Sequence, residues 1–399
     1  GRITPVWLAP KNKHYFVSLP HQKINQLMNI ALDAKRAFHN TRGLGNYSRD
    51  LIRILQEHEI GHLYLFNPQK RKFLGVKIDN NTTEITPQSF FWKKLKSLWR
   101  SLKITAIARD LPIDIYHGLS GEIPHNIHRY IPTVVTIHDL IFMRYPQLYS
   151  FFDRKMHYRK FLYAAHNAQH IIAISEQTKQ DIIHYLGVPE NKISVVYQGC
   201  HKAFKQTYTE AEKAAVRTKY QLPERFVLNV GAIEPRKNAL EIVKAIAPLP
   251  DLSLVLVGKQ TAYYQQIRNY AQQHHMEHRV QALTGVTMEE LAIIYQLSEV
   301  FCYPSVFEGF GIPIIEALFS GVPVITTQGS CFPEAGGEGS IYISLDNAAD
   351  EICEAIKRIS SDRVLREEMI EKGYAHAQHF TDEAVYQQLM AVYKKNEQL

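Results

Sequence analysis

Short apolar runs rich in β-branched residues alternate along this chain with longer amphipathic stretches. The first half contains the runs NIALDA, IDIYHG, PTVVTIHD, HIIAISE and KISVVYQG, and the second half contains RFVLNVGAI, LSLVLVGK, VQALTGV, EVFCYPS, VPVITTQ and SIYISL. The segments between them have the length of helices, which parallel strands need as crossovers. The alternation therefore predicts an α/β protein with two Rossmann-like, doubly wound domains.

A polar segment at about residues 200–222 interrupts the alternation. We therefore assign residues 28–204 to an N-terminal domain and residues 205–380 to a C-terminal domain. Residues 381–399 are predicted to form a helix that returns to the N-terminal domain. Because open parallel sheets bind ligands outside the carboxyl ends of their strands, we expect the site in the cleft between the domains.

The residues before Met28 show little periodicity, whereas a first strand pattern begins there. We take Met28 as the natural start of the protein. The alternative is a genuine N-terminal extension, residues 1–27, packed on the surface.

The composition limits the classes of binding partner and the cellular compartment that we expect. The net charge of +7 favours anionic partners such as nucleotides, phospholipid surfaces or nucleic acid, without choosing among them. The four cysteines show no C-x-x-C pairing and no even spacing, so the sequence indicates neither a disulfide framework nor a zinc site. No apolar run approaches the roughly 20 residues that span a bilayer. We expect a cytoplasmic protein.

Two carboxylates stand in the otherwise apolar stretch VFEGFGIPIIEALFSGVPVI. The pattern places Glu308 in a glycine-containing loop and Glu316 near the start of a helix. Backbone N–H groups of Phe310, Gly311 and Ile312 would point out of the helix N-terminus, where they can bind an anion or the hydroxyls of a polyol. Carboxylates accept hydrogen bonds from diols, as in a sugar or a ribose. The alternative is that Glu316 complements the helix dipole and Glu308 is solvated.

A basic turn follows the first strand run of the second half. In LNVGAIEPRKNALEIVKAI, Arg236 and Lys237 precede a helical pattern that begins near Asn238. Cations at such a turn can neutralise a diphosphate, and arginine adds geometric recognition of its oxygens. The alternative is a basic turn that is only solvated.

Two pairs of residues in the first half are further candidates. Gly43 and Gly45, in HNTRGLGNYSRDLIRIL, lie before a predicted helix, and the missing third glycine argues against a nicotinamide site. An ordinary loop is the alternative there. His138 and Asp139 end the strand run PTVVTIHD, where the histidine can hydrogen-bond a sugar hydroxyl and the aspartate can accept protons or orient a neighbour. A purely structural histidine is the alternative.

Residues 89–110 combine aromatic and basic side chains. In SFFWKKLKSLWRSLKITAIARD, a helix would place Trp92, Leu95, Trp99 and Leu102 on one stripe with cations beside it. The segment carries no acidic residue before its last position, so it suits the surface of an anionic membrane. A core-packed helix with a solvated basic face is the equal alternative.

In combination, these motifs resemble the retaining GT-B glycosyltransferases of family four, often called glycosyltransferase group 1. The resemblance covers almost all of the chain from about Met28 onward. Its most specific part is FEGFGIPIIEA, in which seven residues separate two glutamates around a GFG, followed by SGVPVI. The resemblance implies the GT-B fold, in which two domains face each other across a cleft, with the acceptor on the N-terminal side.

The resemblance also implies roles for individual residues. Glu308 would contact the transferred hexose near its anomeric centre, and Glu316 would bind the donor ribose. The backbone amides of Phe310, Gly311 and the neighbouring Ile312 would hold the donor sugar.

Further residues match the family outside this motif. Gly43 and Gly45 resemble the glycine loop near the donor phosphates. His138 resembles the active-site histidine beside the sugar, and Asp139 follows it as an orienting or acceptor-side residue. Lys237 matches the phosphate-binding lysine.

One departure concerns the glycine turn of the second domain. Many members carry arginine directly after this glycine, whereas here Gly231 is followed by Ala232. Arg236 would then supply the missing cation, and Gly231 remains part of the expected donor site. The form EPRKN is similar to the mannosyltransferase-like branch that builds surface polysaccharides. The segment YQGCHKAF resembles the interdomain N-G-V-D segment of the family only loosely.

We therefore expect a retaining glycosyltransferase that moves a hexose, mannose by preference, from a nucleotide sugar to a glycan or lipid-linked glycan acceptor. GDP-mannose is the favoured donor, and a UDP-sugar is the alternative. No metal, no cofactor and no nucleic-acid partner are expected, and an anionic membrane surface is a candidate partner through residues 89–110. The rival interpretations are a nucleotide-sugar epimerase and a non-enzymatic protein that binds nucleic acid or an anionic surface.

Overall fold

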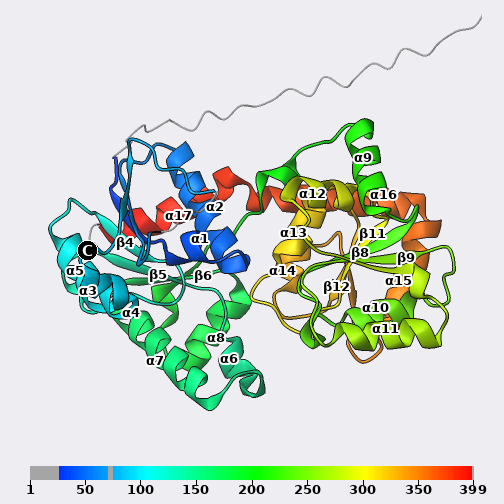
Figure 1. The fold of residues 1–399 in the computed structure, drawn as a ribbon, viewed down its shortest axis with the longest axis horizontal. Helices are drawn as coiled ribbons and strands as arrows, with labels where there is room; N and C mark the ends of the chain where they lie inside the picture. Colours follow the sequence, from blue (N-terminus) through cyan, green and yellow to red (C-terminus); the bar gives the residue numbers. More distant parts are fainter. Residues whose placement is uncertain (1–26, 71–74, 398–399) are drawn as a thin grey trace, which may run out of the picture.

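The computed structural model describes residues 27–70 and 75–397 of the chain. Within them the chain forms two parallel sheets, and Figure 1 shows the two resulting domains side by side. The predicted α/β architecture with two doubly wound domains is confirmed. The expected extension over residues 1–27 lies, apart from Leu27, outside the described residues, so the assignment of Met28 as the start stays a prediction.

Seven described strands build the sheet of the N-terminal domain, in the order β3-β2-β1-β4-β5-β6-β7. They are β1 (Ile30–Asp33), β2 (Leu63–Phe66), β3 (Thr82–Ile85), β4 (Ile115–Gly118), β5 (Thr133–Ile137), β6 (His170–Ala173) and β7 (Ile193–Val195). Neighbouring strands pair in parallel, so their carboxyl ends share one edge. The sequence prediction lacks β2 and β3, because LYLF has no β-branched residue and the edge strand TTEI is polar and partly exposed.

In the described part of the C-terminal domain, six strands form a parallel sheet in the order β10-β9-β8-β11-β12-β13. They are β8 (Phe226–Val230), β9 (Ser253–Val257), β10 (Val280–Leu283), β11 (Val300–Tyr303), β12 (Val324–Thr327) and β13 (Ile341–Ile343). Each of the six strand runs predicted in the second half contains one of them.

Helices cover both faces of each sheet. Those of the first half are α1 (Lys35–His39), α2 (Gly43–Glu57), α3 (Phe90–Lys94), α4 (Lys96–Leu98), the π-helix η1 (Trp99–Lys103), α5 (Ile104–Arg109), α6 (Ile141–Arg144), α7 (Phe151–Asn167) and α8 (Glu176–Leu186). Those of the second half are α9 (Glu210–Tyr220), α10 (Ala239–Ile246), α11 (Tyr264–Gln273), α12 (Met288–Leu297), α13 (Ile312–Phe319), α14 (Phe332–Gly336), α15 (Ala348–Ser361), α16 (Arg363–Ala377) and α17 (Asp382–Glu397).

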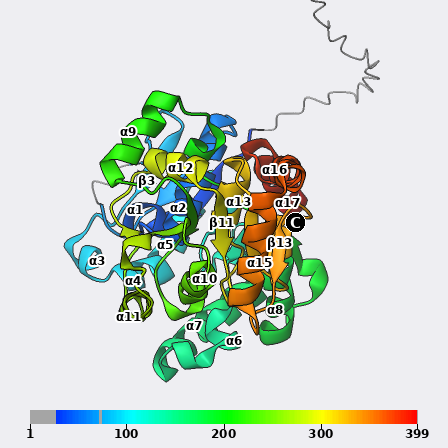
Figure 2. The same ribbon diagram turned by 90° about the vertical axis from the view of Figure 1, so that its right-hand side faces the viewer.

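Alternate residues of the strands face two apolar layers in each domain. In the N-terminal domain, α1, α2 and α17 pack on one face of the sheet, and α5, α7 and α8 pack on the other. In the C-terminal domain, α12 and α13 cover one face while α10, α11 and α15 cover the other. Figure 2 shows α12 and α10 on opposite sides of β11.

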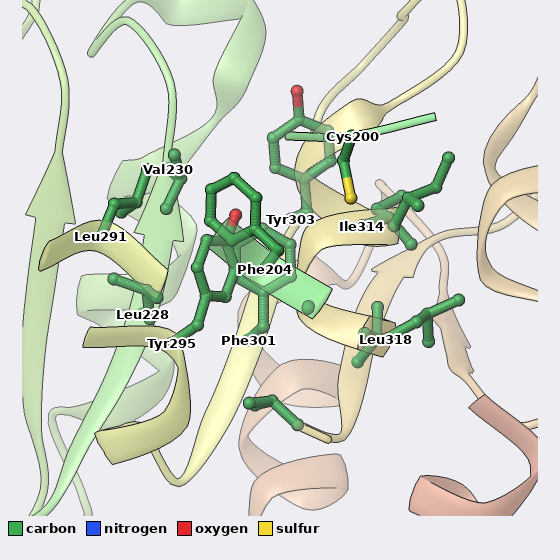
Figure 3. Packing of buried hydrophobic residues seen from close by; sticks show 14 of the residues in the cluster. Cys200, Phe204, Leu228, Val230, Leu291, Tyr295, Phe301, Tyr303, Ile314 and Leu318 are labelled. Atoms are coloured by element: carbon green, nitrogen blue, oxygen red, sulfur yellow. The ribbon is translucent and has the colours of Figure 1, made fainter. Parts of the chain in front are cut away.

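The core beneath α13 contains closely packed aromatic side chains. Phe204 packs edge-on against Tyr295 of α12 with ring centres 5.5 Å apart, and Tyr295 lies 5.2 Å from Phe301 of β11. Figure 3 shows these rings beside Ile314 and Leu318 of α13. This packing holds the start of α13 against the sheet.

The last helix, α17, packs on the N-terminal domain. It contacts α2 and β4, and its side chains Leu389 and Tyr393 are buried in the core of that domain. Figure 1 shows it in red beside α2. The described chain therefore crosses between the domains twice, once near residue 200 and once before α17.

The single amphipathic helix expected over residues 89–110 is not formed. The chain leaves helical geometry at Leu95, and the following π-helix η1 turns Trp99 into the core, where it is 1% exposed. Arg100 follows it inward, because its guanidinium pairs with Asp33 at 2.5 Å. The predicted stripe is therefore divided, since Trp99 is buried while Leu95 and Leu102 stay exposed.

The expected glycine loop before α2 is also different. Gly43 is the first residue of the helix and Gly45 lies in its first turn, so both belong to the helix and not to a preceding loop. A Cβ atom at position 45 would lie 1.7 Å from the carbonyl oxygen of Asn40, which excludes any other residue there without movement of the chain. Residue 45 is glycine because α1 and α2 pass this close.

No helix within residues 27–70 and 75–397 combines the length and the apolar character needed to cross a bilayer.

Candidate active site at the carboxyl edges of the two sheets

The loops that follow β8 and β11 meet at the carboxyl edge of the C-terminal sheet. Glu308 follows β11, and Arg236 and Lys237 belong to the turn η6 (Pro235–Lys237) after β8. Lys237 Nζ donates to Glu308 Oε1, and Arg236 Nη1 lies 2.9 Å from the same oxygen. Ser305 Oγ donates to that oxygen at 2.6 Å. Two cations and a hydroxyl therefore converge on one carboxylate oxygen.

This ion cluster is largely buried. The side chains of Lys237, Glu308 and Arg236 are 11%, 12% and 23% exposed. Burial alone would raise the pKa of Glu308, but Lys237 and Arg236 together with hydrogen bonds outweigh it and hold the pKa below its usual value. Glu308 is therefore ionised at neutral pH, and neither it nor the basic turn is merely solvated.

Lys237 is directed into the site by its surroundings. Its ammonium group donates to the hydroxyl of Tyr303 at 2.6 Å, and a Cβ atom at position 231 would touch its aliphatic stem at 3.5 Å. Gly231 has a φ of 137°, a conformation that side chains rarely permit. The glycine that follows β8 thus provides the turn beneath Lys237.

The N-terminus of α13 opens directly beside Glu308. Its N-cap is Gly311 with a φ of 102°, and no side chain of the described residues caps it. The first N–H groups of such a helix have no intrahelical partner and attract anions or hydroxyl oxygens. The ring of Phe310 is buried and stacks on Tyr197 at 5.3 Å, so only the backbone of Phe310 can face a ligand. Ile312 begins the helix and is half-buried.

Glu316 lies in the second turn of α13. Its carboxylate accepts a hydrogen bond from the Tyr295 hydroxyl at 2.8 Å. The residue keeps some exposed surface, but the carboxylate lies within the protein, and burial raises its pKa to about 7 against the opposing effect of Tyr295. Tyr295 was not predicted from the sequence, because it is one of several aromatic core residues and no local motif distinguishes it.

His138 follows β5 at the carboxyl edge of the N-terminal sheet. Its Nε2 lies 2.9 Å from the carbonyl oxygen of Leu119, and since a carbonyl only accepts, Nε2 carries the proton. Burial lowers the pKa of His138 to about 4, so the ring is neutral and Nδ1 is its acceptor. The ring of Tyr47 packs edge-on against it at 4.5 Å.

A buried hydrogen-bond network lies behind His138. The Tyr47 hydroxyl is 3.1 Å from Thr136 Oγ, which is 2.7 Å from Nε2 of His117, and Nδ1 of His117 is 2.7 Å from the Tyr393 hydroxyl. Burial also lowers the pKa of His117, to about 3. The network joins α2, β5, β4 and α17, and it was not predicted from the sequence because its members lie far apart in the chain.

Asp139 is turned toward its own backbone. Its Oδ1 accepts the N–H of Ile141 at 3.0 Å, at the entry to α6, and burial raises its pKa. Arg236 and Glu308 both act on this pKa, so Asp139 lies close to the ion cluster of the other domain.

The start of α2 belongs to the same region. No side chain of the described residues caps this helix at Arg42, so its first N–H groups point outward. Tyr47, one turn after Gly43, touches His138. The contact brings the beginning of α2 beside the histidine.

The two domains touch at this site. A Cβ atom at Gly309 would lie 2.7 Å from the carbonyl oxygen of His138 and 3.4 Å from Asp139 Cβ. The structure thus brings His138 and Asp139 together with the loop of Glu308, the basic turn and the N-terminus of α13. In the residues that the structure describes, no group of three or more His, Cys, Asp or Glu side chains is arranged to hold a metal ion.

Two family models match the chain. The model described as Glycosyl transferases group 1 matches residues 211–376, and the model described as Glycosyltransferase Family 4 matches residues 41–203. O-antigen chain mannosyltransferase B of Escherichia coli is 28% identical over 371 residues, which cover 88% of this chain and 96% of that protein. O-antigen chain mannosyltransferase RfbU of Salmonella typhimurium is 30% identical over 226 residues, which cover 55% of this chain and 60% of that protein.

Solved structures share the fold at low sequence identity. HepE from Anabaena, determined in complex with UDP and glucose, aligns with a TM-score of 0.69 at 18% identity, over 92% of this chain and 99% of that chain. The predicted GT-B architecture and the predicted family are both confirmed: the chain belongs to glycosyltransferase group 1.

Proposed function

We propose that the protein is a retaining hexosyltransferase that moves mannose from a nucleotide sugar to a glycan or lipid-linked glycan acceptor in surface polysaccharide synthesis. The similarity to O-antigen chain mannosyltransferases supports this sugar and this pathway class. GDP-mannose is the first donor to test. The complex of HepE with UDP and glucose keeps UDP-sugars as the second choice.

The observation that carries the proposal is the buried ion cluster directly before the N-terminus of α13. A carboxylate held ionised by Lys237 and Arg236, beside unpaired helix N–H groups, offers both signs of charge where two loops meet. A nucleotide sugar presents hydroxyls and a diphosphate side by side, so it needs both. A protein that only binds an anionic surface does not require this arrangement. A nucleotide-sugar epimerase would bind the same ligand, and the similarity to glycosyltransferases favours transfer over it.

In this proposal each group has one task. The contacts of Glu308 described above all fall on Oε1, which leaves Oε2 to accept a hydrogen bond from a hydroxyl of the transferred hexose. The amides at Phe310 to Ile312 hold other hydroxyls of the sugar. Glu316 accepts from the ribose, while Lys237, Arg236 and the glycine start of α2 surround the diphosphate.

The chemical step is a front-face displacement. The bond between the anomeric carbon and the diphosphate oxygen breaks, and its electron pair stays on that oxygen. The acceptor oxygen bonds to the same face of the carbon, and its proton passes to the departing phosphate oxygen. Lys237, Arg236 and the helix N-terminus stabilise the charge that develops there, without a metal. The Nδ1 atom of neutral His138 accepts a hydrogen bond from a sugar hydroxyl. Closure of the cleft excludes water from the reaction.

We also propose that the N-terminal domain lies on the cytoplasmic face of an anionic membrane. Phe90 and Phe91 of α3 are 74% and 58% exposed, and Phe151 and Phe152 at the start of α7 are 62% and 81% exposed. Both helices carry lysines or arginines nearby. Glu122 pairs with Arg100 of η1 and with Lys160 of α7, so η1 and this part of α7 lie close together. The proposed surface adds the start of α7 to the segment that the sequence predicts.

Calorimetric titration with GDP-mannose, UDP-glucose and UDP-N-acetylglucosamine tests the donor site. We expect one donor to bind, and Glu316→Ala to abolish or strongly weaken that binding. Glu289→Ala, which removes an exposed glutamate of α12, is the matched control and should bind as the wild type does. Turnover of the best binder with an acceptor then identifies transfer.

The rivals give other results. An epimerised sugar formed without any acceptor would favour the epimerase. Salt-sensitive nucleic-acid binding without affinity for these or other nucleotide sugars would favour the non-enzymatic protein.

Sedimentation with vesicles tests the membrane surface. The double variant Phe151→Ser, Phe152→Ser should lose binding to anionic vesicles, whereas Val364→Ser, at a position 66% exposed on α16, should not. Equal binding of both variants would remove this part of the proposal.

A further inference from the structure

Two buried hydroxyl groups lie side by side at the start of α8, in the N-terminal domain. Ser175 is the N-cap of this helix, and its Oγ accepts the N–H of Thr178 at 3.0 Å. The two residues are 0% and 2% exposed, and their hydroxyl oxygens are 3.0 Å apart. Neither residue is among the site residues that the sequence predicts.

Each hydroxyl also faces a backbone carbonyl of the candidate site. Ser175 Oγ lies 2.8 Å from the carbonyl oxygen of Gly309, and Thr178 Oγ lies 3.0 Å from the carbonyl oxygen of His138. A carbonyl only accepts and a hydroxyl has one proton to donate. Ser175 therefore donates across the cleft to the C-terminal domain, and Thr178 donates within its own domain.

The two carbonyls belong to the two halves of the site. Gly309 is the residue after Glu308, and His138 is the histidine at the end of β5. The two backbone segments approach so closely that a Cβ atom at position 309 would lie 2.7 Å from the carbonyl oxygen of His138. The two hydroxyls thus bond to the backbone segments that carry Glu308 and His138, and they can fix the position of one segment relative to the other.

A second contact from the C-terminal domain supports the same helix start. Glu334 of α14 accepts the N–H of Glu176 at 2.7 Å and the N–H of Gln177 at 3.4 Å. The Tyr197 hydroxyl donates to it at 3.2 Å. A carboxylate at a helix N-terminus is favourable because it faces the positive end of the helix dipole. The C-terminal domain therefore holds the start of α8 at two points, Gly309 and Glu334.

We propose that Ser175 and Thr178 are positioning residues for the transfer reaction, which hold the His138 strand end and the Glu308 loop in one closed arrangement. The proposal rests on the proposed function. Donor contacts at Lys237 and Glu316 lie in the C-terminal domain and do not involve these hydroxyls. Loss of a hydroxyl should therefore lower kcat while the KM for the donor changes little.

Thr178→Val is the first variant, because it keeps the shape of the side chain and removes the proton given to His138. We expect kcat to fall about 10- to 100-fold, in line with the sensitivity of transfer to small displacements, and the donor KM to stay within about twofold. Thr178→Ser restores the hydroxyl and should recover most of the rate.

The matched control is Thr105→Val in α5. Thr105 Oγ donates to the carbonyl oxygen of His125 at 2.8 Å, away from the cleft, so the same substitution removes the same kind of bond. It should lower the melting temperature without lowering kcat. Equal kcat values for the two valine variants, no recovery in Thr178→Ser, or a rise in KM that accounts for the loss would overturn the proposal.

A second measurement needs no donor and separates this proposal from the function. Small-angle X-ray scattering should give a larger radius of gyration for Ser175→Ala and for Glu334→Gln than for the wild type. Thr209→Ala, which removes the N-cap of α9 without a cross-domain bond, should leave the radius unchanged. An unchanged radius in both cleft variants would overturn the closing role even if transfer is observed. If the radius of gyration is larger in the cleft variants but the wild type transfers no sugar, the result would contradict only the proposed function.

Discussion

The two domains form their sides of the cleft in different ways. The C-terminal side is charged, because Glu308 shares a buried cluster with Lys237 and Arg236. On the N-terminal side the two buried histidines are neutral, because burial holds the pKa of His138 at about 4 and that of His117 at about 3. In the proposed reaction, the C-terminal side stabilises the charge that develops on a departing diphosphate. The N-terminal side would contribute shape and hydrogen bonds, so substitutions there should act on geometry and stability.

The largest effect is expected from Lys237→Ala, which removes a cation from the charged side. Loss of this one electrostatic contact should lower kcat/KM about 100- to 1,000-fold. Steady-state kinetics with the donor identified by calorimetry measure the change. Lys244→Ala removes a lysine of α10 that pairs with Glu241 of the same helix, and it should leave kcat/KM within about twofold. A comparable loss of kcat/KM in both variants would contradict a specific role of Lys237 at the diphosphate.

An intermediate effect concerns Glu316 and the dependence of stability on pH. Its folded pKa of about 7 lies above the ordinary value of 4.5, so the native state binds more protons than the unfolded state between these pH values. Its contribution to the free energy of unfolding is therefore fully favourable below pH 4.5 and decreases as the pH rises to 7. The decrease should amount to about 3 kcal/mol.

Urea denaturation at several pH values measures this decrease. The variant Glu316→Gln, which cannot titrate, should lack it, whereas the exposed control Glu289→Gln should keep it. Identical pH profiles for wild type and Glu316→Gln would show that the Glu316 carboxylate does not carry the proton.

The smallest effect on activity is expected from Tyr393→Phe on the N-terminal side. The change leaves one ring nitrogen of His117 without its buried partner, which should cost about 1–3 kcal/mol of stability. Because His138 is not bonded to this tyrosine, kcat should fall less than about threefold. Tyr130→Phe, at a position 54% exposed, serves as the control for denaturation. A tenfold loss of kcat without a loss of stability would instead make the network part of the chemistry.

How far the sequence predicts each side depends on how local its features are. Glu308, Glu316 and Lys237 stand in short contiguous motifs at strand ends, and the parallel sheet topology then brings such ends to one edge. In the described part of the C-terminal domain, β8, β9, β11 and β12 are almost fully buried, and each of the six strands lies in a run predicted from periodicity. The family follows from the same motifs.

The N-terminal side was less predictable because its features are not local. The edge strand β3 is polar, so it gives no apolar run. A regular helix would place Trp99 on one stripe with Trp92, Leu95 and Leu102, whereas the π-helix η1 turns the Trp99 side chain into the core. The bond between His117 and Tyr393 joins residues 276 positions apart, and no spacing rule reaches that distance.

The most direct test of the central claim is to follow the reaction by proton NMR, with the α-linked nucleotide sugar that calorimetry selects and a glycan acceptor. We predict that the wild type consumes the donor and forms an α-linked product, and that Lys237→Ala does so at least about 100-fold more slowly. A β-linked product, or equal rates in wild type and variant, would contradict the account of a retaining transfer driven by the charged side of the cleft.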